Sequence, residues 1–166
     1  MSLPNFFLRG AVVALAVASL AGAELKVGDS FPAFRAAGVT NLAGGELPAT
    51  EGKVVLVDFW ASWCTPCKLS FPWMNQMHEQ LGAQGLRIVA INLDRKEADA
   101  QRFLAQAPAR FAIAMDAAAE TAKLLAIQAM PTSLLVAADR SVLFTHRGFK
   151  LEDRADLEAK LRATLK

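Results

Sequence analysis

Both cysteines of this 166-residue sequence lie in one segment, VVLVDFWASWCTPCK, which spans residues 54–68. Its first seven residues, 54–60, form a nearly continuous run of β-branched and aromatic side chains, which is typical of a strand covered on both faces. A helix can begin directly afterwards, near Pro66, because proline is tolerated in a first helical turn. The sequence therefore predicts that Cys64 and Cys67 lie where a buried strand meets the start of a helix.

Strands and helices are predicted to alternate along most of the chain. Further strands are expected at 86–93, 111–115, 132–137 and 142–147, and helices at 65–81, 96–107, 117–126 and 151–165. Residues 27–48 are rich in turn residues and are expected to carry short N-terminal strands. This order predicts an α/β sandwich with a central mixed sheet, in one domain over residues 24–166.

The first 23 residues have the features of a secretory signal. Arg9 precedes an apolar stretch over residues 11–20, and Ala21-Gly22-Ala23 places small residues at the positions that signal peptidase reads. We expect cleavage after Ala23 and export to the periplasm. A membrane-anchored form is the less favoured alternative, because the apolar stretch is well short of the roughly 20 residues that cross a bilayer.

The charge and the size of the chain bear on its partners and on the role of its cysteines. The formal net charge is only +2, which indicates no nucleic-acid or anionic-membrane partner. A domain of this size buries a core without disulfide staples, and a loop of a few residues restrains the unfolded chain very little. We therefore interpret Cys64 and Cys67 as a reaction centre, in a protein expected to be monomeric.

The positions of the two cysteines predict a different role for each. Cys64 is expected to be the attacking nucleophile, because backbone amides and the helix dipole stabilise a thiolate at a helix start. Cys67, one turn further in and less exposed, is expected to resolve the mixed disulfide. Thr65 and Pro66 should tune the balance between dithiol and disulfide. Together with Trp63, which the pattern first assigns to packing, they are candidates for substrate contact.

Asp58 lies six residues before Cys64 in an otherwise apolar strand. Burial would disfavour its anion and raise its pKa, which suits a proton acceptor for Cys67. The alternative is a structural role, in which the carboxylate pairs with a lysine or caps a backbone amide.

Residues 58–68, with Pro72 five positions after Cys67, resemble the active-site strand and helix of the thioredoxin superfamily. Met130-Pro131-Thr132 is similar to the cis-proline loop that faces the cysteines in that fold. The long spacing between these landmarks, the opening segment at 27–32 and the export signal resemble the TlpA-like branch of periplasmic thiol-disulfide oxidoreductases. The resemblance implies a thioredoxin-like fold with an N-terminal extension and an inserted strand-helix segment. It also implies a redox-active disulfide, with no further cofactor and no metal.

The resemblance also implies roles for residues near the cysteines. Pro131 is expected to be cis, which leaves the backbone of Met130 free to pair with an extended substrate segment. The thioredoxin pattern has a buried aspartate at Asp58, whereas TlpA-like proteins more often have asparagine there and a glutamate where this chain has Ser70. This departure indicates Asp58 as the proton acceptor.

The function implied is reduction of disulfides in exported proteins, in cytochrome c or copper-protein maturation, with electrons from a transmembrane thiol-disulfide carrier. A periplasmic disulfide oxidase or isomerase is the alternative. The cytochrome-maturation branch is expected to have an acidic residue after the cis-proline, where this chain has Thr132, so that client is not assigned.

Three other classes fit the sequence less well. A structural zinc site needs four ligands, and only His78 and His146 could join the cysteines, at a spacing that matches no zinc template. We expect His78 on an exposed helix face and His146 at a strand end. A peroxiredoxin-type peroxidase expects a lone peroxidatic cysteine. A copper-binding chaperone would hold the metal through the cysteine pair.

Overall fold

The computed structural model describes residues 24–33, 39–44 and 46–165 of the chain. The predicted signal sequence and its cleavage site after Ala23 lie outside the described residues. Within them, no helix is long and apolar enough to span a membrane.

A mixed sheet forms the centre of the fold, as predicted. Its strands are β1 (Thr40–Asn41), β2 (Val54–Trp60), β3 (Leu86–Asn92), β4 (Ala112–Met115), β5 (Thr132–Val136) and β6 (Val142–Arg147), in the spatial order β1-β4-β3-β2-β5-β6. The strands β2, β3 and β4 are parallel. The pairs β2–β5, β5–β6 and β1–β4 are antiparallel.

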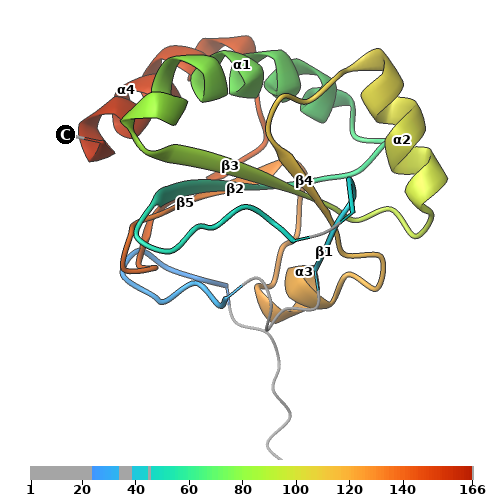
Figure 1. Cartoon of the computed structure of the whole chain (residues 1–166), viewed down its shortest axis with the longest axis horizontal. Helices are drawn as coiled ribbons and strands as arrows, with labels where there is room; N and C mark the ends of the chain where they lie inside the picture. The colour runs from blue at the N-terminus through green and yellow to red at the C-terminus, as the bar shows by residue number, and fades with distance from the viewer. Residues whose placement is uncertain (1–23, 34–38, 45, 166) are drawn as a thin grey trace, which may run out of the picture.

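Helices cover both faces of the sheet (Figure 1). The long helix α1 (Thr65–Leu81) and the C-terminal helix α4 (Arg154–Thr164) lie on one face, with α2 (Glu97–Gln106) beside them, and the short α3 (Glu120–Leu124) lies on the other. Because side chains alternate along a strand, β2 supplies both cores. Leu56 and Trp60 pack in the cluster under α1, whereas Val55, Val57 and Phe59 pack in the cluster on the α3 side.

The helix predicted at 117–126 is the clearest error of the sequence analysis. It covers only Glu120–Leu124. Its start is set by Asp116, which accepts hydrogen bonds from the backbone N–H groups of Glu120 and Thr121 at 2.8 and 2.9 Å, and Ala126, with a φ of 48°, cannot continue it. Ala119 has a φ of 54°, in the left-handed region that a helix interior excludes. The segment before the helix is therefore a turn held by a carboxylate.

Strand directions bring the predicted site residues to one edge of the sheet. The chain leaves β2 at Trp60 and enters α1, while β5 begins at Thr132, which pairs with Phe59. The loop before β5 and the loop after β2 are therefore neighbours.

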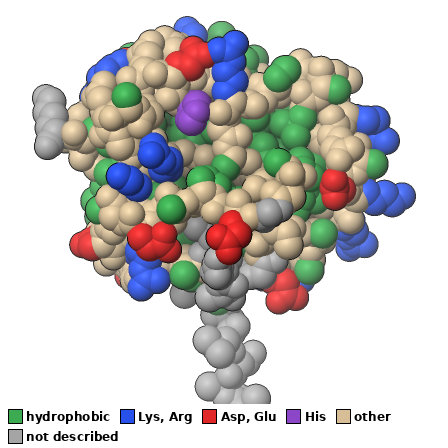
Figure 2. Space-filling model, viewed as in Figure 1, with side chains coloured by type: hydrophobic (Ala, Val, Ile, Leu, Met, Phe, Trp, Pro, Cys, Tyr) green, Lys and Arg blue, Asp and Glu red, His purple; other side chains and the backbone are tan. Residues whose placement is uncertain are grey.

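On the face in Figure 2, positive and negative side chains are interspersed over the surface.

Candidate active site

The two cysteines form a disulfide at the start of α1. Cys64 is the N-cap residue of the helix, and its Sγ accepts a hydrogen bond of 3.3 Å from the backbone N–H of Cys67. The S–S bond is 2.00 Å long. Cys64 is 3% exposed and Cys67 is fully buried, so the sulfur of Cys64 is the one that a partner reaches first.

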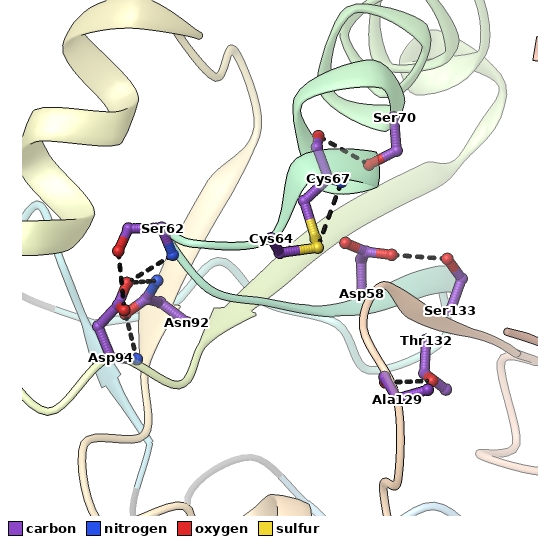
Figure 3. Close-up of a disulfide and its surroundings, with 10 residues drawn as sticks. All are labelled: Asp58, Ser62, Cys64, Cys67, Ser70, Asn92, Asp94, Ala129, Thr132 and Ser133. Carbon is purple, nitrogen blue, oxygen red and sulfur yellow. Dashed lines mark hydrogen bonds between the residues drawn. A yellow bond between two sulfur atoms is a disulfide. The ribbon is translucent and has the colours of Figure 1, made fainter. Parts of the chain in front are cut away.

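A hydrogen-bond network fixes the loop that leads into the disulfide. Asp94, which follows β3, accepts from the backbone N–H of Ser62 at 2.9 Å and from its hydroxyl at 3.0 Å. Asn92 donates its side-chain amide to the same carboxylate at 2.8 Å. These contacts hold the backbone two residues before Cys64 (Figure 3).

Asp58 is completely buried below the disulfide. Its Oδ1 accepts a hydrogen bond of 2.6 Å from the Ser133 hydroxyl, and its Oδ2 has no hydrogen-bond partner. Figure 3 shows this second oxygen directed toward the sulfur atoms. Burial raises the pKa of Asp58 from 3.8 to about 7, and the hydrogen bond from Ser133 partly opposes that rise. The partner is therefore Ser133, not the lysine or the backbone amide of the structural alternative.

Ser70 stands where TlpA-like proteins more often have a glutamate. Its side chain is buried on α1, and its hydroxyl donates to the Cys67 carbonyl at 3.1 Å. This side chain is held within its own helix and carries no acid, so the carboxylate near the disulfide comes from β2.

The loop before β5 has the geometry expected of a docking loop. The Met130–Pro131 peptide bond is cis. The Pro131 carbonyl accepts a hydrogen bond of 2.7 Å from Gly148, and the Thr132 hydroxyl donates to the Ala129 carbonyl at 2.7 Å. Met130 itself is half-buried, at the rim of the site.

The two tryptophans before the disulfide differ sharply in exposure. Trp60 is fully buried, and its ring lies 4.9 Å from that of Phe71. Trp63 is 71% exposed, so the packing interpretation first given to it is wrong. Thr65 is also exposed and Pro66 is half-buried. Exposed apolar surface therefore adjoins the disulfide.

Two residues that contact the site, Ser133 and Asp94, were not predicted from the sequence. Ser133 is the second residue of the predicted strand at 132–137, just before its apolar part, and Asp94 directly follows the predicted strand at 86–93. Each is a polar residue at the sheet edge where the cysteines lie, and that placement could have drawn attention to it. Among the residues that the structure describes, no group of three or more histidine, cysteine or acidic side chains could hold a metal ion.

Fold and site together define a thioredoxin-like protein with a redox-active disulfide. The family model described as Redoxin matches residues 26–161. A solved structure from Chlorobium tepidum, assigned as a thiol:disulfide interchange protein DsbE, is 41% identical with a TM-score of 0.74, covering 86% of this chain and all of that one. The thiol-disulfide oxidoreductase ResA of Bacillus thuringiensis subsp. konkukian is 29% identical over 135 residues, 80% of this chain and 76% of the relative. ResA from a Bacillus cereus strain is 30% identical over 122 residues, 72% of this chain and 69% of the relative.

The chain belongs to the Redoxin family and is a TlpA-like member of the thioredoxin superfamily. It is a thiol-disulfide oxidoreductase whose CxxC pair is Cys64 and Cys67. Enzymes of this kind act on thiols and disulfides of proteins and use the redox-active disulfide itself, without a further cofactor.

Proposed function

We propose that the protein is exported to the periplasm and reduces disulfides of other proteins there. Cys64 is the nucleophile, Cys67 the resolving thiol and Asp58 the proton acceptor. The supporting observation is the buried carboxylate: Cys67 is sealed from water, and the unpartnered Oδ2 of Asp58 is directed toward the disulfide.

The reaction begins with the reduced enzyme. The Cys64 thiolate attacks one sulfur of the substrate disulfide, and the other sulfur leaves as a thiolate. The Cys67 thiol gives its proton to the carboxylate of Asp58, and the resulting thiolate attacks the Sγ of Cys64. The second substrate thiolate leaves, and the enzyme disulfide forms. A pKa of about 7 suits Asp58 to this transfer at neutral pH, because an acceptor works best when its pKa is near the working pH.

Substrate docking is assigned to the rim of the disulfide. An extended segment of the substrate lies along Met130 and Pro131, where its backbone pairs with the loop before β5. The exposed ring of Trp63, with Thr65 and Pro66, contacts the same segment. The protein works as a monomer, and a transmembrane thiol-disulfide carrier returns it to the dithiol form. Maturation of cytochrome c or of copper proteins is a setting that suits such a reductant, but with Thr132 after the cis-proline no cytochrome client is assigned.

The proposal of export is supported by residues 1–23, whose charged, apolar and small-residue regions have the order of a signal peptide. N-terminal sequencing of the secreted protein should begin at Glu24. A mature chain that still begins at Met1 would contradict the proposal.

The direction of electron flow is tested by equilibrating the protein with glutathione. A potential near the thioredoxin value of about −270 mV supports a reductant, and one near about −120 mV supports the oxidase alternative. The roles of the two cysteines are tested with Cys67→Ser, which should accumulate a mixed disulfide with a protein substrate, seen by mass spectrometry. Cys64→Ser should form none. A mixed disulfide through Cys67 would reverse the assignment.

A further inference from the structure

A row of polar side chains crosses the sheet from Asp58 toward the surface. Asp58 on β2 pairs directly with Ser133 on β5, and Ser133 pairs directly with His146 on β6. Residues opposite each other on neighbouring strands point to the same face, with Cβ atoms about 4.5–5.5 Å apart. The row therefore lies side by side on the helix-covered face of the sheet.

The neighbours along each strand confirm which face this is. Trp60, Leu135 and Phe144, each two positions from a member of the row, all belong to or pack against the cluster under α1. The row therefore passes through the same layer as the buried carboxylate below the disulfide.

Exposure increases along the row. Asp58 is fully buried, Ser133 is 8% exposed, and the side chain of His146 is 25% exposed. The Nε2 atom of His146 lies 3.3 Å from Oδ2 of Asp153, at the end of the 3₁₀ turn Leu151–Asp153. That turn is at the surface, so His146 lies between the buried Ser133 and a partly exposed carboxylate, and its Nε2 atom is itself buried without a hydrogen bond.

We propose that Ser133 and His146 form the route by which the proton taken up by Asp58 reaches solvent. This inference rests on the proposed function, because the proton arises from Cys67 during resolution. His146, a residue that touches neither cysteine, thus limits the rate at which neutral Asp58 loses its proton and becomes able to accept the proton of Cys67.

Each step of the route passes one proton from a donor to an acceptor. Rotation of the carboxyl group brings the proton of neutral Asp58 to the Ser133 oxygen. A hydroxyl both accepts and donates, so Ser133 takes this proton and passes its own to an imidazole nitrogen of His146. The imidazole turns from Asp153 toward Ser133 to receive it, and the imidazolium then gives a proton to water. Asp58 is left as a carboxylate that can accept the proton of Cys67.

The charged groups around His146 come from three elements. Asp153 faces it from the 3₁₀ turn, and that carboxylate also accepts from the backbone N–H of Lys150. From β2, Asp58 faces it through Ser133. From α4, Lys160 lies over the Phe144 ring, but its Nζ is bound by Asp156. Among the described residues, Asp153 supplies the carboxylate that contacts the imidazole, from the 3₁₀ turn at the surface.

The test separates resolution from initial attack by using 5,5′-dithiobis(2-nitrobenzoate) as the disulfide. Cys64 releases the first thionitrobenzoate, and Cys67 releases the second when it resolves the mixed disulfide. Stopped-flow absorbance of the full mature protein records both phases. The variants are His146→Gln and, as a matched control, His78→Gln. The sequence has only these two histidines, and His78 lies on α1, far along the helix from the disulfide.

In His146→Gln, the second release should slow by about tenfold near neutral pH, part of the roughly 10²- to 10⁴-fold that positioned acid–base groups contribute. The first release and the reduction potential should be unchanged, and added imidazole should restore the second phase. His78→Gln should alter neither phase. A second phase of wild-type rate at every pH, equal slowing of both phases, or slowing that imidazole does not relieve would overturn the inference. Wild-type protein that releases no second equivalent would instead refute the proposed function itself.

Discussion

Replacing Asp58 with asparagine should make the oxidised protein more stable at neutral and alkaline pH. The carboxylate is fully buried, and one of its oxygens has no partner. Asparagine has almost the same shape and keeps an oxygen that can accept from Ser133, but it does not ionise. The substitution therefore removes a buried charge while leaving the hydrogen bond seen at Oδ1.

The size of the effect follows from the pKa. Burial raises the pKa of Asp58 from 3.8 to about 7. In the unfolded chain the carboxyl loses its proton near its ordinary value, so between about pH 4 and 7 the folded protein holds one more proton than the unfolded one. Stability from this group therefore falls as pH rises through that window. At about 1.36 kcal/mol per pKa unit, the loss reaches at most about 4 kcal/mol above pH 7.

The assay is urea unfolding of the oxidised protein, followed by tryptophan fluorescence from about pH 4 to pH 8. The gain in unfolding free energy of Asp58→Asn over wild type should be near zero at about pH 4 and should grow to several kcal/mol at about pH 8. Asp139→Asn is the control: that exposed carboxylate has its pKa lowered by hydrogen bonds from Ser141, so its loss should act in the opposite direction. A gain that does not change with pH would refute the reasoning.

Three further predictions concern the surroundings of the disulfide. Ser133→Ala should raise the pKa of Asp58 further, because the lost hydrogen bond lowers it. The pH profile of mixed-disulfide resolution should then move to higher pH, and an unmoved profile would argue against Asp58 as the acceptor. Asp94→Asn weakens the hydrogen bonds to Ser62 and should reduce unfolding free energy by about 1.5–3 kcal/mol, measured in urea. An unchanged midpoint would mean that the loop does not depend on this carboxylate. Trp63→Ala should leave the unfolding midpoint unchanged, because the ring is 71% exposed, and should raise KM for a protein substrate. A fall in stability without a change in KM would place Trp63 in packing instead.

Much of the fold could be predicted because the sequence signals are strong and local. The run 54–60 contains almost only β-branched and aromatic residues, and it forms β2 within the predicted bounds. The helix after it begins at Thr65, where proline in the first turn indicated a start. The helix predicted at 117–126 was wrong because of a side-chain contact near its start. Its alanines favour helix, but the carboxylate of Asp116 binds the backbone amides of Glu120 and Thr121, so the helix begins at Glu120 and not at residue 117.

Those site residues could be predicted whose role depends only on the local sequence. The spacing of Cys64 and Cys67 and the position of Asp58 in an apolar strand were visible in the sequence, and the structure brings the three together. Ser133 could not be found in the same way, because its role depends on the register between β2 and β5. That register is a long-range property, since the two partners are 75 residues apart in the chain.

The placement of the carboxylate on β2, not on α1, connects stability with catalysis. A glutamate on α1 would belong to a helix whose first turn favours anions. Asp58 instead lies between apolar neighbours on β2 and is completely desolvated. Desolvation disfavours the charged form in the resting protein, and the same desolvation makes the carboxylate a strong enough base to take a proton from a buried thiol at neutral pH. Formation of a thiolate at Cys64 adds a second negative charge nearby, so the proton of Asp58 and those of the cysteines are expected to titrate together. The pH profile of exchange should then belong to this coupled set, and Asp58→Asn should simplify it to the titration of the thiols alone.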